Sequence, residues 1–155
     1  MKCERRERFV TGELELKITG GCHCGKITYE AEVNPDNVVV CHCSYCQILS
    51  GSAFRTVVFS ENDAFTFLTG EPRIYLKTGD SGNIREQAFC PNCGSPIYST
   101  SDGDGPKQYG IRLGTVNQRD LITPKSQKWH GSSQSWTQDI GLMPITDKQL
   151  SLIHI

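Results

Sequence analysis

Seven of the eight cysteines fall into three short groups, and this spacing constrains the chain more than any other feature. The groups are Cys22-His23-Cys24, Cys41-His42-Cys43-Ser44-Tyr45-Cys46 and Cys90-Pro91-Asn92-Cys93, while Cys3 stands alone. Disulfide scaffolds usually spread their cysteines along the chain to close loops, and random burial of thiols does not produce such regular pairs. The spacing therefore indicates metal ligands.

Length, charge and hydropathy exclude several other classes of protein. A chain of 155 residues is typical of one domain with a real core. Its net charge of −1 argues against a protein held to nucleic acid by bulk positive charge. The longest obvious apolar run, Val38-Val39-Val40-Cys41, is far shorter than the ~20 residues of a membrane span. The first residues lead into mixed charge and not into an apolar signal core, so we expect a cytoplasmic protein without a membrane partner.

Short alternating segments separated by Gly, Pro, Asn and Asp indicate a mainly β protein. We expect a strand within residues 1–20, where the alternation is loose, and further strands over 26–33, 38–41, 56–59, 65–68, 73–77, 84–89, 96–99 and 109–113. Gly20-Gly21 breaks the first alternation, and Asn34-Pro35-Asp36-Asn37 is predicted to be a turn. Helical structure is limited to 44–49 and a turn near 115–119. The pattern predicts antiparallel sheets in a single, sandwich-like domain.

Two of the cysteine pairs fit a closed metal site with four ligands. Cys90 and Cys93 enclose Pro91-Asn92 and precede a glycine, which is the form of a zinc knuckle. Cys22 and Cys24 are the natural second pair, because residues i and i+2 of an extended chain face the same way. We therefore predict a structural zinc bound by these four thiolates.

The remaining three cysteines, Cys41, Cys43 and Cys46, lie within one segment of six residues. Three protein ligands and an open fourth position are typical of a catalytic zinc. His23 and His42 each lie between two cysteines, so we expect their side chains to point away from the metals. The alternative is a second closed site, completed by Cys3 or by a distant histidine such as His130.

These motifs resemble the glutathione-dependent formaldehyde-activating enzymes, whose domain is shared with centromere protein V. The resemblance is carried by Gly20-Gly21-Cys22-His23-Cys24-Gly25, Cys41-His42-Cys43-Ser44-Tyr45-Cys46 with Ser50-Gly51-Ser52, Arg85 with Phe89-Cys90-Pro91-Asn92-Cys93-Gly94-Ser95, Ile111-Arg112-Leu113-Gly114-Thr115 and a late tryptophan, Trp136. It implies a zinc-stabilised Mss4-like domain over 20–145, with 1–19 as an N-terminal extension or edge strand and 146–155 as a C-terminal tail. It also implies carbon–sulfur lyase chemistry, the reversible joining of glutathione and formaldehyde as S-hydroxymethylglutathione.

The favoured hypothesis is an enzyme with two zinc ions. In this hypothesis Cys41, Cys43 and Cys46 form the catalytic site, where a thiol such as glutathione takes the open position and reacts with an aldehyde. Because glutathione carries net negative charge, the site needs cations, and Arg55 is the first candidate, with Arg112 and Lys128 behind it. Three aromatic residues could line the pocket: Tyr45, Phe54 and Trp136. Of these, we assign substrate binding to Trp136.

Two hypotheses without catalysis stay open. One is a zinc-stabilised binding module in which both metals are structural, although no strand interleaves aromatic and basic residues as a nucleic-acid surface would. The other is a thiol-responsive or metal-buffering protein that uses the labile triplet without any substrate.

Overall fold

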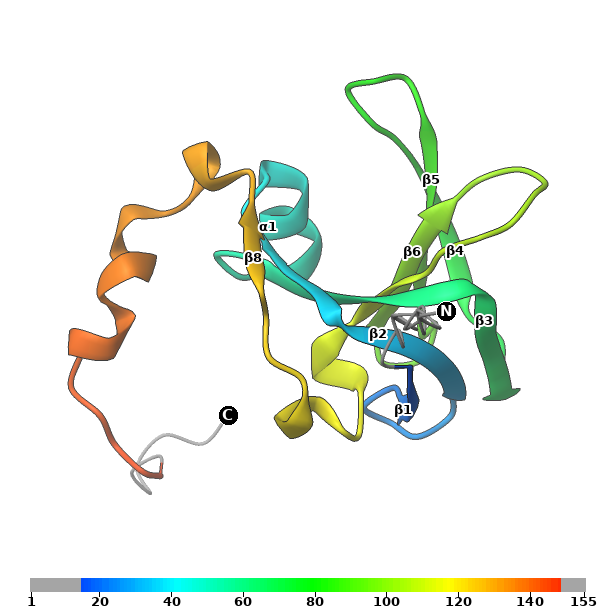
Figure 1. The fold of residues 1–155 in the computed structure, drawn as a ribbon, viewed down its shortest axis with the longest axis horizontal. Coiled ribbons are helices and arrows are strands. Elements are labelled where there is room, and N and C mark those ends of the chain that lie inside the picture. The colour runs from blue at the N-terminus through cyan, green and yellow to red at the C-terminus, as the bar shows by residue number, and fades with distance from the viewer. Residues whose placement is uncertain (1–14, 149–155) are drawn as a thin grey trace, which may run out of the picture.

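The computed structural model describes residues 15–148, and eight strands, one α-helix and four 3-10 helices follow one another along this part of the chain (Figure 1). The strands are β1 (Leu16–Gly21), β2 (Thr28–Cys41), β3 (Arg55–Thr69), β4 (Arg73–Thr78), β5 (Ile84–Phe89), β6 (Pro96–Ser101), β7 (Gly110–Arg112) and β8 (Ser126–Lys128). The helices are α1 (Ser44–Ser50), η1 (Leu113–Thr115), η2 (Arg119–Leu121), η3 (His130–Ser132) and η4 (Ser135–Leu142). None of the helices in residues 15–148 is long and apolar enough to cross a membrane.

All eight strands belong to one sheet, in the order β1-β2-β3-β7-β6-β5-β4 with β8 beside β2. Every neighbouring pair in that order is antiparallel, which confirms the predicted mainly β, antiparallel class. The strands join in a single sheet and not in separate sheets. β1 pairs with residues 28–33 of β2 and β8 with residues 39–41, so the two short strands lie beside different parts of β2.

The predicted turn at Asn34-Pro35-Asp36-Asn37 is wrong, because the chain continues through it as part of the 14-residue strand β2. Turn chemistry is nevertheless present: the amide of Asp36 donates to Asn34 Oδ1 at 2.9 Å. Val33 pairs with Ser60 and Val38 with Val58, so the four intervening residues form a bulge. A bulge of this kind bends a strand without reversing it.

Two further differences concern β3 and β8. The strands expected at 56–59 and 65–68 are one strand, β3, interrupted by a bulge between Ser60 and Phe65. β8 was not predicted, and it is the one strand of the described region that pairs in parallel. Its three residues are all exposed, so it carries no apolar alternation that a sequence pattern could reveal.

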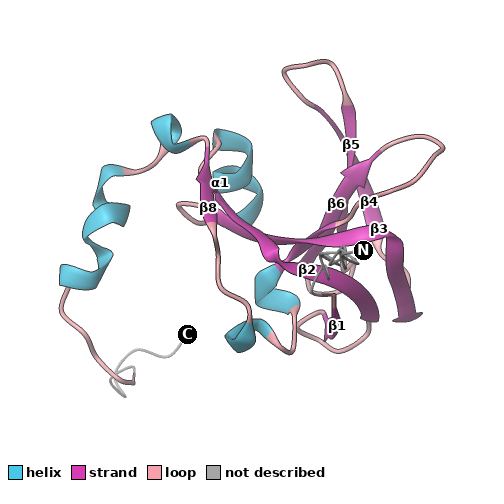
Figure 2. Ribbon diagram, viewed as in Figure 1, coloured by secondary structure: helices cyan, strands magenta, loops and turns pink. Residues whose placement is uncertain are grey.

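The core draws buried residues from both ends of the sheet. Ile18, Tyr29, Val58, Ile97 and Ile111 are each 0% exposed and belong to one cluster. Since β1 and β6 stand far apart in the strand order but share this cluster, the sheet curls around its own core. The helical turns of residues 130–142 lie beyond β8, on the side away from β4, β5 and β6 (Figure 2).

Candidate metal centres

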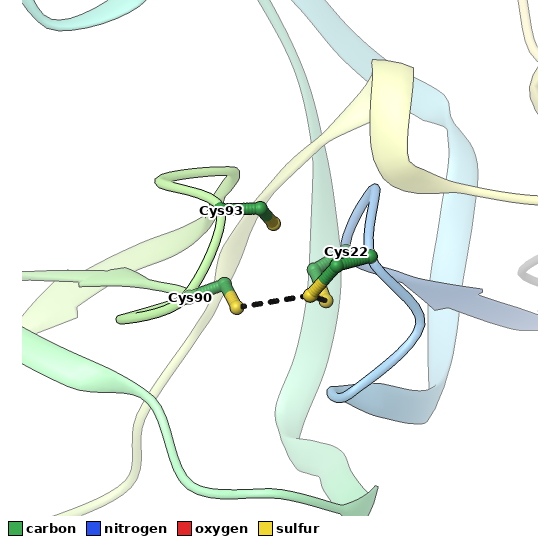
Figure 3. A group of neighbouring side chains, drawn as sticks. Cys22, Cys90 and Cys93 are labelled. Atoms are coloured by element: carbon green, nitrogen blue, oxygen red, sulfur yellow. Dashed lines mark hydrogen bonds between the residues drawn. The ribbon is translucent and has the colours of Figure 1, made fainter.

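The first group of sulfur atoms joins two loops that are distant in sequence. Cys22 and Cys24 lie in the loop after β1, and Cys90 and Cys93 in the loop after β5. Figure 3 shows Cys90 and Cys93 facing Cys22 across the space between these loops. The Sγ atoms of Cys22 and Cys24 are 3.5 Å apart, and those of Cys24 and Cys90 are 3.8 Å apart. A tetrahedral zinc with bonds of about 2.3 Å separates its sulfurs by roughly 3.8 Å, so this donor set fits a metal ion.

Local backbone hydrogen bonds shape each of the two loops. The amide of Cys22 donates to the carbonyl oxygen of Ile27 at 3.0 Å, and the amide of Ile27 donates to Cys22 Sγ at 3.2 Å. In the second loop the amide of Cys90 donates to the carbonyl oxygen of Ser95 at 2.9 Å. Gly94 follows the second cysteine with φ 74°, a left-handed conformation that glycine adopts at little cost. The backbone thus folds back toward the sulfurs, as the knuckle motif predicts.

The surroundings of this group favour thiolates at some positions and thiols at others. Hydrogen bonds from the Ser95 hydroxyl and amide lower the pKa of Cys93 to about 5. For Cys90 the amide of Cys93 works in the same direction, but burial and the neighbouring sulfurs outweigh it and raise the pKa to about 11. Metal binding requires deprotonated sulfur, so an ion at this site displaces the remaining protons.

The second group, which we call the triplet, consists of Cys41, Cys43 and Cys46. Cys41 is the last residue of β2, Cys43 caps the N-terminus of α1, and Cys46 lies in the first turn of that helix. The amide of Cys46 donates to Cys43 Sγ at 3.3 Å, so the helix cap also fixes a sulfur atom. All three residues are half-buried, and their Sγ atoms lie within 4.8 Å of one another. This spacing also suits a single metal ion.

The charge state of the triplet is set by its own members and by one arginine. A hydrogen bond from the Cys46 thiol, further contacts with Cys43 and the positive charge of Arg55 lower the pKa of Cys41 to about 5. The same contact with Cys41 raises the pKa of Cys46, because the Cys46 proton is the one that is shared. Between these two sulfurs the negative charge is therefore favoured on Cys41 and the proton on Cys46.

Within residues 15–148, no fourth cysteine, histidine or carboxylate joins the triplet. His130 lies elsewhere, with its ring 5.7 Å from the ring of His42. Cys3, the other residue considered as a fourth ligand, lies outside the described residues. His42 is buried on the other face of β2, where its Nε2 is 2.8 Å from Gln127 Oε1. In the described structure the triplet thus offers three protein ligands.

The triplet opens into a cavity of about 280 Å³ whose wall is rich in positive charge. Five cationic side chains contribute to it: Arg55, Lys77, Arg85, Arg112 and Lys128. Arg55 and Arg112 are both only 6% exposed, and burial lowers the pKa of each guanidinium, that of Arg112 to about 9. The positive charge of Arg55 also lowers the pKa of Arg112.

Both buried guanidiniums depend on one neutral acceptor. Arg112 Nη2 donates to Gln87 Oε1 at 2.8 Å, and Arg55 Nη1 lies 3.5 Å from the same oxygen. The Nε atoms of both arginines are buried without a hydrogen-bond partner. No ion pair joins either of them to a carboxylate in the part of the chain that the structure describes. Buried cations require anions nearby, and the sulfurs of the triplet are the anionic groups at hand.

The structure brings together some of the predicted site residues and separates others. Arg55, Arg112, Lys128 and Tyr45 line the triplet cavity, as does Trp129, which the sequence analysis missed. Trp136 instead borders a different groove, beside Gln47, Ile48 and Gln134. Phe54 lies with His42 in a further groove on the opposite face of β2.

Two further residues of the cavity, Arg85 and Gln87, alternate along β5 and could have been found from that pattern. Trp129 follows the unpredicted strand β8, so no sequence signal placed it there.

Known proteins resemble this chain in sequence and in fold. The family described as "Glutathione-dependent formaldehyde-activating enzyme" matches residues 17–132. A crystal structure of a Rhodobacter sphaeroides protein from structural genomics is similar in fold, with a TM-score of 0.53 and 22% sequence identity. The match covers 71% of this chain and 99% of that one. Both cysteine groups, from Cys22 to Cys93, lie within the family match.

Proposed function

The chain belongs to the glutathione-dependent formaldehyde-activating enzyme family, and from this premise we propose that it is a carbon–sulfur lyase with two zinc ions. Its substrates are a thiol such as glutathione and a small aldehyde such as formaldehyde. In the forward direction the thiol sulfur bonds to the carbonyl carbon, and the proton lost from sulfur ends on the carbonyl oxygen. The reverse reaction releases the aldehyde from the adduct.

The observation that supports this proposal is a three-sulfur group facing a cavity with buried arginines that have no carboxylate partner within residues 15–148. A closed structural site needs neither an open ligand position nor cations beside it. Three thiolates and one zinc ion carry a formal charge of −1, whereas Arg55 and Arg112 together carry +2. The excess of positive charge favours a ligand that is itself anionic, and glutathione carries such groups.

Each residue of the site has a distinct role in the proposed reaction. Cys41, Cys43 and Cys46 hold the zinc ion, and the bound metal would keep the sulfur of the incoming thiol deprotonated. Arg55 and Arg112 attract the anionic thiol and orient it. Gln87 positions the two guanidiniums side by side, because its Oε1 atom accepts a hydrogen bond from each of them. The triplet cysteines stay bound to metal, so none of them acts as a covalent nucleophile.

The four-cysteine site has a structural role in this proposal. Cys90 is 1% exposed and belongs to the core cluster, and the site ties the end of β1 to the end of β5. A metal there stabilises the fold that presents the triplet, without taking part in the reaction.

The direct test is acceleration of adduct formation. Zinc-loaded protein is mixed with glutathione and formaldehyde, and the exchange between free and S-hydroxymethyl glutathione is followed by NMR against the spontaneous rate. We expect acceleration by the wild-type protein, none by Cys43→Ser, and at least a tenfold loss with Arg55→Met. Zinc content and circular dichroism of each variant are measured in parallel to show that the fold persists.

Two results would overturn the proposal in favour of a binding module. One is a protein with two firmly bound zinc ions that glutathione does not perturb. The other is an exchange rate equal to the spontaneous rate for several thiols and aldehydes.

A further inference from the structure

Trp129 is held beside the triplet by the strand that precedes it. β8 pairs with β2 so that Lys128 faces Cys41, and the amide of His42 donates to the carbonyl oxygen of Lys128 at 3.0 Å. On the following side, the amide of Ser132 donates to the carbonyl oxygen of Trp129 at 3.1 Å. Backbone contacts therefore fix the position of this residue relative to the cysteine that ends β2.

The backbone of Trp129 is left-handed, with φ 56° and ψ 38°. In the described residues one other non-glycine residue, Asp63, has a positive φ. Asp63 has a local reason, since the amide of Lys107 donates to its Oδ1 at 2.9 Å and aspartate tolerates this conformation. A bulky indole side chain makes the same conformation costly, so strain of this kind points to a function.

Burial of the indole does not offset this cost. Trp129 is 66% exposed, yet it lines the triplet cavity together with Lys128 and Arg85. The strained backbone therefore has no compensating burial of the indole within the chain, and a ligand in the cavity would supply the missing contacts. The other tryptophan, Trp136, is 46% exposed and lies at a different groove.

We propose that Trp129 is a specificity-determining residue whose indole packs on the amide planes of a peptide thiol bound at the triplet. This inference rests on the proposed function, which supplies the thiol at Cys41, Cys43 and Cys46. Indole rings pack well on flat amide groups, and Lys128 and Arg85 provide charges for the carboxylates of such a peptide. A small neutral thiol such as 2-mercaptoethanol has neither feature, so Trp129 distinguishes the two classes.

Intrinsic fluorescence gives a first test, because the chain has only two tryptophans. Trp136→Phe leaves Trp129 as the reporter, and Trp129→Phe leaves Trp136. We expect glutathione to change the emission of the zinc-loaded Trp136→Phe protein in a saturable manner. The emission of Trp129→Phe should stay unchanged. Unchanged emission from Trp129, in a protein that binds glutathione by calorimetry, would overturn the inference.

Calorimetry with two thiols separates this inference from the proposed function. Trp129→Ala should lose about tenfold in affinity for glutathione and nothing in affinity for 2-mercaptoethanol, while the matched variant Trp136→Ala keeps both. Equal glutathione affinity in wild type and Trp129→Ala would refute the role of Trp129 alone. Absence of any thiol binding to the zinc-loaded wild-type protein would refute both proposals.

A stability measurement excludes a merely structural role. Trp129→Gly removes the indole and relieves the left-handed backbone. It should therefore unfold at no lower a temperature than the wild type, retain both zinc ions and still bind glutathione weakly. A lower unfolding temperature accompanied by loss of zinc would show that Trp129 supports the fold, and would overturn the inference.

Discussion

Single cysteines of the two groups differ in depth and in local role. Cys90 is 1% exposed within the core, whereas Cys43 is half-buried at the start of a helix. We predict that Cys90→Ser yields unfolded or insoluble protein, because losing a structural zinc removes roughly 10 kcal/mol, comparable to the net stability of a domain. Cys43→Ser should fold and lose one metal ion, since serine is itself a preferred N-cap for α1.

Circular dichroism, solubility and zinc content decide this prediction, with the same substitution made at both positions. Equal loss of folded protein in the two variants would contradict the division between a structural and a functional metal site.

The buried hydroxyl of Tyr29 makes stability sensitive to alkaline pH. Burial raises the pKa of Tyr29 to about 12 from an ordinary value of 10, and its hydroxyl lies 2.8 Å from Thr115 Oγ1. The folded state thus keeps a proton that the unfolded state releases above pH 10, so stability is complete below pH 10 and falls as pH rises toward 12. The expected loss is about 2–3 kcal/mol for this residue.

Tyr29→Phe lacks this ionisation, so its free energy of unfolding should fall less steeply between pH 9.5 and 11.5, a range chosen from that pKa. Urea titrations at several pH values measure the two slopes. Parallel slopes for variant and wild type would show that the Tyr29 hydroxyl does not govern the alkaline limit.

At the level of structural elements, the loop between β5 and β6 depends on a left-handed glycine. Gly94 has φ 74° and no atom near the position of a Cβ. Gly94→Ala should lower the free energy of unfolding by about 1–2 kcal/mol through backbone strain alone, and weaken zinc binding at Cys93.

Gly114→Ala is the matched control for this loop, since Gly114 also has open space around it but no positive φ. Denaturant titration of the zinc-loaded proteins compares the two. Equal stability of both variants would mean that the loop tolerates an L-residue at Gly94.

The elements that were predicted correctly are those with local patterns. Alternation marked the strands from β4 to β7, and the helix expected at residues 44–49 is α1. The bulge at residues 34–37 was predicted as a turn because its residue types are those of turns, and Asn34 does accept a turn-like hydrogen bond from the amide of Asp36 within the strand. β8 could not be predicted, because its three exposed residues show no apolar alternation and form a strand only by pairing with β2.

For the whole molecule, the two metal sites should differ in how easily they release their ions. The triplet is half-buried and open to a cavity, whereas the four-cysteine site includes two buried sulfurs. We predict two zinc ions per chain, of which a mild chelator removes one without change in the circular dichroism spectrum. Removal of the second should coincide with unfolding, and simultaneous loss of both ions would contradict the prediction.

The sequence predicted which cysteines come together at both candidate sites, but only part of the cavity around the triplet. Cysteine spacing is a local property, so the two groups followed from it directly. The cavity is assembled from α1 and from every strand between β2 and β8, and such a juxtaposition depends on the curl of the sheet. For this reason the sequence analysis selected Arg55, which follows the triplet closely in the chain, but missed Trp129, which is distant from it in sequence.

The sequence separation of the ligands has a consequence for the chain during its synthesis. All three cysteines of the triplet are present once Cys46 has been synthesised. The four-cysteine site is still incomplete at that point, because Cys90 follows Cys24 by 66 residues. A nascent chain emerging from the ribosome therefore presents three neighbouring thiols long before the four-cysteine site can close. We therefore expect metal capture during synthesis to begin at the triplet, and the four-cysteine site to close last.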